Sequence, residues 1–446
     1  MKLYNKTTSL RVGLFVLIPM ALGFLMPNRV LRLWNGLSHT LDSALVGRAN
    51  AQSDDGPYAA YTEALQEIKK EYYGDPIDAK KNKELTFAAI RGMLYSLNDP
   101  FTSFLDPEEW QQMRQTTSGE FEGIGAVLEP FGKDVRVKNP LPDTPAFKAG
   151  IKSGDIIMSV GTHNPSTGKL TKTTTTLGKD INDVVKLIKG PRGTIVTITV
   201  IRKGANQPLT FLLKRAHIEP PIVRYWMEDK KAGIGHILLN EFNEKSDKQL
   251  DKAWTELEKQ GMKSLIFDLR YNPGGLLNVA VDIGSRFIDS GPVVIIQEGR
   301  GGVRQGLKMR PGQHTHDRIP MVVLANENSA SASEIVAGAI KDNETGILMG
   351  EHTFGKGLVQ TLFELHDGSA LRLTTAKYFT PKGNDISNKY DEDHRPLFGT
   401  GGIKPDIEVK QSEDWSDQNF DDKKNDTQLQ AAIEYLRANA QTMSRK

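Results

Sequence analysis

One serine and one lysine of this chain stand in sequence contexts that could support nucleophilic chemistry. Ser331 lies in the run Ser-Ala-Ser-Ala-Ser-Glu at 329–334, between an apolar stretch at 321–325 and a helical pattern at 335–340. The start of a helix offers free backbone N–H groups and a partial positive charge, so an oxyanion formed by attack of this serine could be stabilised there. Lys356, in the sequence Phe-Gly-Lys-Gly, is the candidate base.

A lysine removes a proton from a serine only while its amine is neutral. The ordinary lysine pKa of about 10.4 would leave the amine almost wholly charged at pH 7. Its surroundings must therefore exclude water. Phe354 and Leu358, together with the small Gly355 and Gly357, suit close packing around the amine. We therefore expect Lys356 to be desolvated and its pKa to be lowered.

Simpler interpretations of these residues stay open at this point. Ser331 and Glu334 fit the S-x-x-E capping box, in which the serine only caps a helix. A Gly-Lys-Gly sequence is often a surface turn. His352 lies nearest the lysine as another base, and His314 and His316 are expected in a loop. The chain has neither a Gly-x-Ser-x-Gly nor a His-Glu-x-x-His motif, so an α/β-hydrolase triad, a zinc peptidase and a metal site are not indicated.

The serine run, the lysine 25 positions after Ser331 and a glutamine four residues further on resemble, in combination, the carboxyl-terminal processing peptidases of family S41. In these tail-specific proteases a serine nucleophile is paired with a lysine base, which is an established variant of the Ser-His-Asp triad. The resemblance implies that Ser331 is the nucleophile, Lys356 the general base and Gln360 the residue that orients the lysine. It implies no cofactor. If residues 356–360 form a strand, Lys356 and Gln360 point to the same face.

A second motif follows an apolar stretch at 264–270, which predicts a strand. It reads Asp-Leu-Arg-x-Asn-Pro-Gly-Gly and ends at Gly274 and Gly275. The carboxyl end of a strand is where sites collect in open α/β sheets, although the motif alone also fits a plain helix-entry turn. The resemblance implies that Gly274 or Gly275 donates one backbone N–H to an oxyanion hole, and that Ala332 donates the other.

A glycine-rich sequence at Gly123, Ile124, Gly125 and Ala126 resembles the carboxylate-binding loop of a PDZ domain, and matches at 141–146, 149–157 and 190–193 strengthen the resemblance. Backbone N–H groups in such a loop bind a terminal carboxylate, while the peptide adds as a strand to a sheet edge. Ala126 stands where a bulky residue often closes the loop. We expect the threonine-rich stretch Asn164–Lys179 to be a surface loop.

The order of these patterns predicts an α/β multidomain chain. Strand patterns at 233–239 and 264–270 flank a helical one at 247–260, an alternation that indicates βαβ units. The resemblance covers residues 57–436 and implies a crotonase/ClpP-like catalytic core, with a loop insertion at 384–401. The expected parts are a signal peptide or anchor with linker (1–52), a helical N-terminal region (57–117), a PDZ domain (119–215), the S41 peptidase core (222–409) and a polar C-terminal tail with one helix (410–446).

The N-terminus has the pattern of a targeting segment. A basic start with Lys2, Lys6 and Arg11 precedes the uncharged, largely apolar stretch Val12–Met26. Fifteen helical residues rise about 22 Å, less than the roughly 30 Å hydrocarbon core, which favours a signal peptide over a full span. An uncleaved anchor and an N-terminal core helix are the alternatives. Ala49-Asn50-Ala51 resembles a cleavage site, and we expect a periplasmic or exported protein, or one anchored to the inner membrane.

Composition limits the classes of partner. The 446 residues, 38% hydrophobic and 25% charged, suffice for two or three domains with cores. The net charge of +2 is nearly balanced, and no basic patch with interleaved aromatic residues indicates a nucleic-acid partner. The chain has no cysteine, so no disulfide framework is expected.

Together these patterns predict a serine endopeptidase that binds unstructured protein C-termini and cleaves by acyl-enzyme formation. Its expected partners are proteins or peptides with free C-termini, and a homo-oligomer or an envelope adaptor protein is left open. Two hypotheses compete with this one. The first is a PDZ-containing adaptor of the cell envelope that only binds peptides. The second is a structural envelope protein that oligomerises through its helical N-terminal region (57–117). The presence of Ser331, Lys356 and Gln360 favours the peptidase.

Overall fold

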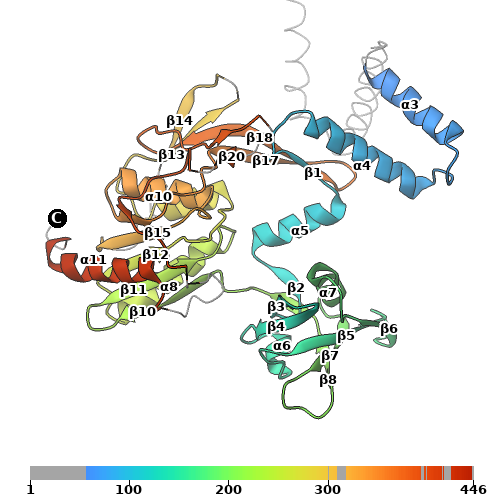
Figure 1. The fold of residues 1–446 in the computed structure, drawn as a ribbon, viewed down its shortest axis with the longest axis horizontal. Helices are drawn as coiled ribbons and strands as arrows, with labels where there is room; N and C mark the ends of the chain where they lie inside the picture. The colour runs from blue at the N-terminus through green and yellow to red at the C-terminus, as the bar shows by residue number, and fades with distance from the viewer. Residues whose placement is uncertain are drawn as a thin grey trace, which may run out of the picture. The chain divides into compact units, whose positions relative to one another are not determined.

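The computed structural model describes residues 57–443 except 300, 309–317, 393–395, 398, 414 and 416–422 (Figure 1). The expected targeting segment, with Ala49-Asn50-Ala51, lies outside these residues, and so do His314 and His316. The chain forms two compact units, which divide between Leu85 and Thr86.

The first unit contributes helix α3 (Pro57–Glu71) and the beginning of α4 (Ala79–Tyr95) to the described residues. Most of α3 is exposed, including the aromatic rings of Tyr58 and Tyr61. Among the helices that the structure describes, none combines the length and the apolar character needed to cross a membrane.

The second unit begins with the rest of α4, the short strand β1 (Ser103–Leu105) and helix α5 (Pro107–Ser118). Asp106 caps α5: its carboxylate accepts the N–H groups of Glu108 and Glu109, and Gly119 ends the helix in the left-handed conformation. Strand β1 pairs antiparallel with β18 (Ala370–Phe379), a strand far away in sequence. The loop between α4 and β1 is thereby brought to the edge of a core sheet.

The predicted PDZ domain is a sheet in the order β3-β4-β5-β7-β8, with β6 paired to β5. On β7, the alternate residues Val196, Ile198 and Val200 are buried, as expected for a strand with one face in the core. The elements are β2 (Phe121–Gly123), β3 (Ala126–Phe131), β4 (Asp134–Pro140), α6 (Pro145–Lys148), β5 (Ile156–His163), β6 (Leu170–Thr175), α7 (Ile181–Ile188), β7 (Ile195–Ile201), β8 (Leu209–Lys214) and β9 (Ala216–Ile218).

The threonine-rich stretch Asn164–Lys179 is not a loop throughout, so this expectation was wrong. Its residues Leu170–Thr175 form β6, which pairs with β5 in the register Ser159↔Thr175 to His163↔Leu170. Threonine is β-branched, and its side chain suits an exposed strand as well as a polar loop. The polar composition therefore indicated that this stretch is exposed to solvent, and not that it lacks regular structure.

The predicted catalytic core contains a sheet in the order β10-β11-β12-β15-β16-β21, in which β11 to β21 run parallel and β10 pairs antiparallel with β11. Its elements are β10 (Val223–Asp229), β11 (Ile234–Leu239), α8 (Ser246–Lys259), β12 (Ser264–Asp268), α9 (Leu277–Gly284), β15 (Met321–Ala325), α10 (Ala332–Asp342), β16 (Ile347–Gly350), β21 (Ile407–Glu408) and α11 (Thr427–Met443).

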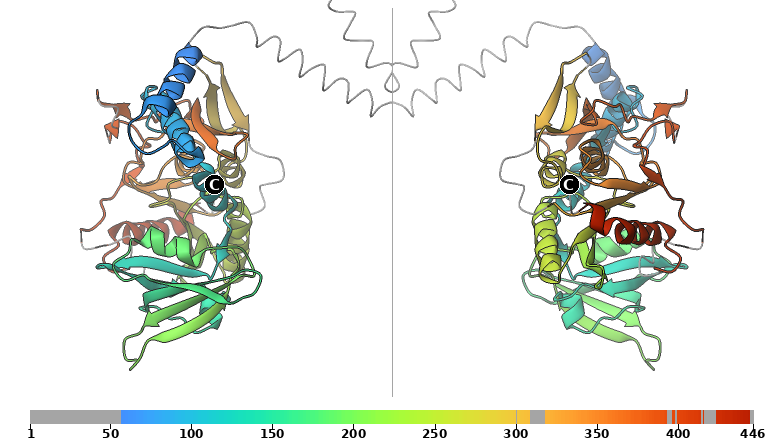
Figure 2. Two further views of the ribbon diagram at one scale, coloured as in Figure 1. Left: turned by 90° about the vertical axis from the view of Figure 1, so that its right-hand side faces the viewer. Right: turned by 90° about the vertical axis from the view of Figure 1, so that its left-hand side faces the viewer.

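Helices cover both faces of this parallel sheet, which explains why β11, β12 and β15 are buried along their whole length. Phe267 and Val323 pack in one cluster with residues of α8, α9 and α10. Their neighbours Ile266 and Val322 pack in another cluster with Leu429 and other residues of α11, drawn red in Figure 2. The sheet is therefore the middle layer of an α/β sandwich.

A second, antiparallel sheet of the core has the order β1-β18-β13-β14, with β17 also paired to β18. Its further elements are β13 (Pro292–Glu298), β14 (Arg304–Lys308) and β17 (Leu358–Glu364). The expected insertion at 384–401 contains the two-residue strands β19 (Lys389–Tyr390) and β20 (Pro396–Leu397), which pair with each other.

A buried ion network fastens α11 to the end of β12. The Arg270 guanidinium, 2% exposed, donates to Asp268 at 2.7 Å and to both carboxylate oxygens of Asp426 at 2.7 and 2.9 Å. Burial by itself would raise the pKa of the Asp268 carboxyl, but the charge of Arg270 and hydrogen bonds from His236 and Arg270 hold this pKa well below its usual range. Asp426 also accepts the N–H of Leu429 in the first turn of α11.

Replacing Arg270 by methionine should lower the free energy of unfolding by about 3–5 kcal/mol, because two carboxylates would stay buried without their counter-charge. The measurement is the urea midpoint followed by circular dichroism. Arg437→Met is the matched control, since Arg437 also joins α11 to the core, through Asp229, but is itself 57% exposed. Its loss should cost no more than about 1 kcal/mol. Equal shifts of the two midpoints would contradict the assignment of stability to the buried network.

Candidate active site

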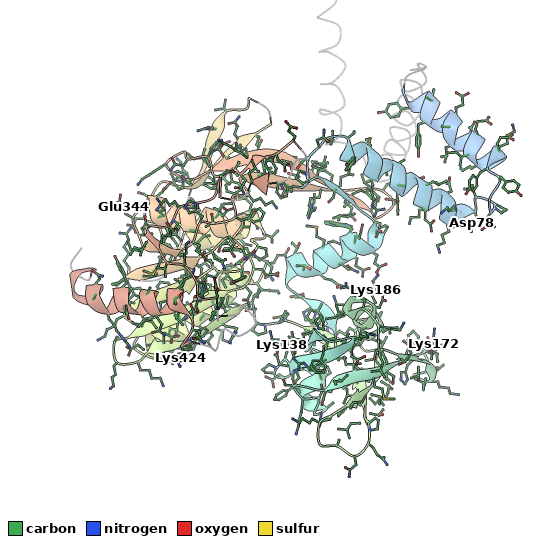
Figure 3. The ribbon with its side chains drawn as sticks, in the orientation of Figure 1. Asp78, Lys138, Lys172, Lys186, Glu344 and Lys424 are labelled. Atoms are coloured by element: carbon green, nitrogen blue, oxygen red, sulfur yellow. The ribbon has the colours of Figure 1, made fainter. Side chains whose placement is uncertain are left out.

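A cavity of about 410 Å³ in the second unit brings together all the residues that the sequence assigned to catalysis. Its wall is built from α5, the loop after β12, the start of α10 and the paired strands β17 and β18. The predicted residues among its lining are Ser331, Lys356, Gln360, Ala332, Gly274 and Gly275. Figure 3 draws the side chains on the ribbon and labels Glu344, which lies two residues after the end of α10.

Ser331 occupies a strained turn between β15 and α10. Its backbone has φ 56° and ψ −112°, a conformation that a residue with a side chain rarely adopts and that costs on the order of 1–3 kcal/mol. The turn is held on both sides by the loop after β12: the N–H of Ala330 donates to the carbonyl of Asn272 at 3.0 Å, and the Ser333 hydroxyl donates to the same carbonyl at 2.8 Å. The strain is therefore fixed by tertiary contacts and presents the serine to the cavity.

The carboxylate of Glu334 joins the serine turn to the lysine segment. Glu334 is 1% exposed, and it accepts the backbone N–H groups of Ser331 at 2.8 Å, Gly355 at 2.6 Å and Lys356 at 3.0 Å. It also accepts the hydroxyl of Thr353 at 2.6 Å, and that of Tyr378 at 3.3 Å. The capping interaction suggested by the Ser-x-x-Glu sequence is thus one part of a larger set, and it does not compete with a catalytic role for Ser331.

Burial raises the pKa of Glu334 above its ordinary value, while its hydrogen bonds oppose the rise. Tyr378 is fully buried beside it, and burial together with the charge of Glu334 raises the tyrosine pKa well above its usual range. Tyr378 therefore stays a hydroxyl donor at neutral pH. Its hydroxyl also lies 3.2 Å from the carbonyl oxygen of Ser331.

Lys356 lies between two glycines and is half-buried. Its ammonium group has no ion pair or hydrogen bond with any residue that the structure describes, and the ring centroid of Phe101 lies 4.9 Å from Nζ. Burial lowers the lysine pKa, and the charge of Arg372 lowers it further, against the opposing charges of Glu334 and Asp99. These surroundings favour the neutral amine that a general base requires.

No hydrogen bond joins Gln360 to Lys356 among the described residues, although the sequence indicated that a contact between them was geometrically possible. Strand β17 begins at Leu358, after Lys356, and its pairing with β18 has a bulge between Val359 and Gln360, so the argument from a shared strand face was wrong. Within the described chain the Gln360 amide donates to the Thr374 hydroxyl at 3.5 Å. Gln360 and Lys356 share only the cavity wall.

The two glycines after Asn272 differ in their backbone N–H groups. The N–H of Gly274 donates to the Asn272 side chain at 2.9 Å, whereas that of Gly275 has no acceptor among the described residues. A Cβ on Gly274 would lie 2.8 Å from the Ser331 Cβ, and one on Gly275 would lie 2.0 Å from the carbonyl oxygen of Phe242. Only glycine allows both approaches, and only Gly275 keeps its donor free.

Ala332 is the first residue of α10, where a backbone N–H has no partner within the helix. It lines the cavity directly after the nucleophile candidate. The geometry therefore offers two N–H donors, from Ala332 and Gly275, in the cavity wall beside Ser331.

The predicted PDZ loop has the backbone that its sequence requires. Gly125 has φ 75°, and a Cβ there would lie 2.3 Å from the Cβ of Thr144. Gly123 closes β2, Ile124 is buried, and Ala126 opens β3. The N–H groups of Ile124 and Gly125 have no acceptor in the part of the chain that the structure describes, and there β3 pairs on one side only, with β4. One edge of β3 is therefore unpaired in the described chain, and it begins next to the N–H groups of Ile124 and Gly125.

Four contributors to the site were missed from the sequence: Phe101, Glu334 as a bridge, Arg372 and Tyr378. From the sequence, Glu334 was recognised only as a member of the Ser-x-x-Glu capping box with Ser331. Phe101 and Arg372 come from segments more than 250 residues apart that meet through the pairing of β1 with β18. No local pattern could have shown that contact.

The described residues contain one group that could hold a metal ion by geometry: Glu120, His217 and Glu219. The ammonium group of Lys245 lies 2.5 Å from the Glu120 carboxylate, so a positive charge is already paired with this acidic group. None of these three residues lines the cavity that contains Ser331.

Comparison with known proteins places these features in one family. The sequence pattern of peptidase family S41 matches residues 233–409, and that of the PDZ domain matches residues 136–202. Among solved structures, the photosystem II D1 C-terminal processing protease shares 33% identity, with a TM-score of 0.44, over 78% of this chain and 86% of that one.

Three relatives extend the match over most of the chain. The carboxy-terminal processing protease CtpA of Bacillus subtilis is 36% identical over 371 residues, which cover 83% of this chain and 73% of that protein. The carboxyl-terminal-processing protease of Synechocystis sp. is 35% identical, over 77% of this chain and 75% of that protein. The probable CtpA-like serine protease of Staphylococcus epidermidis is 35% identical over 77% of this chain, which spans 64% of that protein's length. The predicted fold class is confirmed, and this chain belongs to peptidase family S41, as a serine-type peptidase with a PDZ domain.

Proposed function

We propose that this protein binds the unstructured carboxyl ends of proteins through its PDZ domain and cleaves them with Ser331 and Lys356. The observation that carries the proposal is the bridge of Glu334, which holds the backbones of a strained serine and a desolvated lysine in the wall of one cavity. Relatives bearing the name of C-terminal processing proteases support the same activity.

Acylation follows from the roles of the two side chains. The Ser331 Oγ attacks the carbonyl carbon of the scissile peptide bond, its proton passes to the neutral amine of Lys356, and the carbonyl electron pair moves onto oxygen. The oxyanion then lies between N–H donors whose positions are fixed before the reaction, which is the arrangement that stabilises a transition state most effectively. When the C–N bond breaks, the Lys356 ammonium returns the proton to the leaving amine.

We assign Gly275 and Ala332 as the oxyanion donors. The sequence left Gly274 and Gly275 open, and the Asn272 side chain distinguishes them by engaging the N–H of Gly274. Ala332 adds the positive end of the α10 dipole. Deacylation then repeats the steps with water: its proton passes to Lys356, its oxygen attacks the acyl carbon, and Ser331 leaves with the returned proton.

The PDZ domain supplies selectivity for free carboxyl ends. The unpartnered N–H groups of Ile124 and Gly125 would bind the carboxylate, and the open edge of β3 would pair with the preceding residues of the substrate as an added strand. This recognition reads the backbone, so it suits many sequences. The alternative of a peptide-binding adaptor without catalysis is not favoured, because the catalytic groups share one cavity.

We also propose that the protein acts beyond the cytoplasmic membrane, on the strength of the basic start and the apolar stretch Val12–Met26. Fractionation of cells that produce the full-length protein with a C-terminal tag tests this. Recovery of the tagged protein in the cytoplasmic fraction alone would refute it.

Ser331→Ala and Lys356→Arg should each abolish cleavage of an unfolded protein substrate. Alanine removes the nucleophile, and arginine keeps the charge but stays protonated, so it cannot act as a base. Cleavage is measured by gel electrophoresis and mass spectrometry, with circular dichroism to show that both variants are folded. Near-normal turnover by the folded Lys356→Arg protein would mean that Lys356 contributes charge rather than proton transfer.

Glu334→Gln should lower kcat by about 100-fold, because one amide cannot accept all the donors that the carboxylate serves, and displacement of catalytic groups by about 1 Å costs that much. Glu351→Gln is the control: Glu351 accepts a hydrogen bond from Gln428 and does not line the cavity. It should leave kcat unchanged. A Glu334→Gln enzyme with the parent kcat would show that the bridge does not position the pair.

A peptide with an amidated C-terminus should be cleaved about 10- to 150-fold less efficiently than the same peptide with a free carboxylate. Hydrogen bonds to a charged group contribute about 1.5–3 kcal/mol, and each 1.4 kcal/mol is tenfold. Gly125→Pro, which removes a donor and cannot adopt φ 75°, should erase this preference. Gly132→Ala, at a glycine with similar φ and open space around it, should retain it. Equal rates for both peptides with the parent enzyme would show that the loop does not read the carboxylate.

A further inference from the structure

A short loop from the N-terminal part of the second unit reaches the catalytic lysine. Residues Asp99–Thr102 connect α4 with β1, and the Phe101 ring centroid lies 4.9 Å from Nζ of Lys356. Phe101 does not line the cavity that contains Ser331 and Gln360. Its ring therefore contacts the amine from a side other than the one that a substrate would occupy.

The loop has its own internal brace. The Asp99 carboxylate accepts the N–H of Phe101 at 2.9 Å and the hydroxyl of Thr102 at 2.6 Å. These two bonds close the turn and fix the direction in which the phenylalanine leaves it. The neighbouring Phe104, 4% exposed, anchors the following strand in the core.

The loop is also fastened to the catalytic sheet. The Thr102 hydroxyl accepts the backbone N–H of Thr374 on β18 at 3.2 Å, and the next residue pairs with Arg372 in the register Ser103↔Arg372. Thr374 is the residue that also holds the Gln360 amide. The aromatic ring is thus carried by a segment docked on the same strand that supports the rest of the site.

We propose that Phe101 is a positioning residue of the catalytic base, and that the Asp99–Thr102 loop, by docking on β18, holds its ring against Nζ so that water is excluded from the amine. The proposal rests on the proposed role of Lys356 as the general base. In this proposal the N-terminal region helps to keep the catalytic lysine neutral, in addition to any structural role.

The charges around Lys356 give the sign of the effect. Arg372 on β18 lowers the lysine pKa, Glu334 on α10 and Asp99 in the loop raise it, and burial is the largest influence and lowers it. An aromatic face attracts an ammonium ion, which favours the charged form, but covering the amine removes water, which disfavours that form. Since burial dominates, loss of the ring should raise the lysine pKa.

The test is the pH dependence of kcat for the full chain with Phe101→Ala. The neutral lysine is the active form, so the acid limb of the profile should move to higher pH. At pH 7 we expect kcat to fall about tenfold, with the loss shrinking as the pH rises and more of the amine becomes neutral in both proteins. KM should change by less than about twofold, because the ring is not in the cavity wall.

Conservative and indirect variants separate this role from a purely structural one. Phe101→Leu keeps an apolar side chain over the amine and should restore most of the activity at pH 7. Thr102→Val removes both the bond to Thr374 and the bond to Asp99, so it loosens the loop while leaving the phenylalanine ring in place, and it should move the acid limb in the same direction by a smaller amount. Phe363→Ala is the control, since Phe363 lies on β17 but is 44% exposed and outside the cavity lining, and its profile should match the parent.

Several results would overturn the proposal. An unshifted acid limb in Phe101→Ala, or a loss of equal size at every pH, would show that the ring does not control the base. If Phe101→Ala does not fold by circular dichroism, Phe101→Leu and Thr102→Val decide: a Thr102→Val profile identical to the parent profile overturns the proposal. Failure of the proposed function is recognised separately, because Lys356→Arg would then retain activity in the parent background.

Discussion

The arrangement of this active site depends on one buried carboxylate. Glu334 costs free energy to bury, and the structure offsets that cost with backbone and hydroxyl donors from three segments: the serine turn, the stretch Thr353–Lys356 and Tyr378 on β18. Each donor that satisfies the carboxylate is thereby fixed in place. The nucleophile candidate and the base candidate are positioned by the same group, so the distance between their backbones cannot change without leaving a donor or an acceptor unpaired in the interior.

The parallel sheet brings these segments to one place. Strands β12 and β15 are neighbours, with Asp268 opposite Leu324, and each is followed at its carboxyl end by one loop of the site. The loop after β12 carries Asn272, whose carbonyl accepts two hydrogen bonds from the serine turn after β15. At the same end of β12, Arg270 fastens the C-terminal helix through Asp426. Helix α11 is therefore fastened to the end of β12 from which the loop with Asn272 starts.

Sequence reasoning reached those parts of the site that lie within continuous motifs. The strand at 321–325 and the helix after Ser331 could be predicted, because strand and helix patterns leave local marks, whereas the role of the glycines at 274 and 275 was implied by the family resemblance. It could not choose between the two glycines, since that choice depends on where the Asn272 side chain folds back. The resemblance implied that Gln360 orients the lysine, and the structure shows the Gln360 amide bonded to Thr374, next to a bulge in the pairing of β17 that the sequence did not predict.

The protonation of Lys356 shows why some functional residues leave no local signal. In the unfolded chain this amine has an ordinary pKa and is an ammonium ion at neutral pH, without basicity toward a serine. The groups that change this come from far apart: Phe101 precedes the PDZ domain, Arg372 follows the serine by 41 positions, and they meet only when β1 pairs with β18. The residue types around these two positions predict only a loop and a strand, with no indication of a role beside the lysine. A base assembled in this way has these neighbours only once β1 has paired with β18, because that pairing is what brings the two segments together.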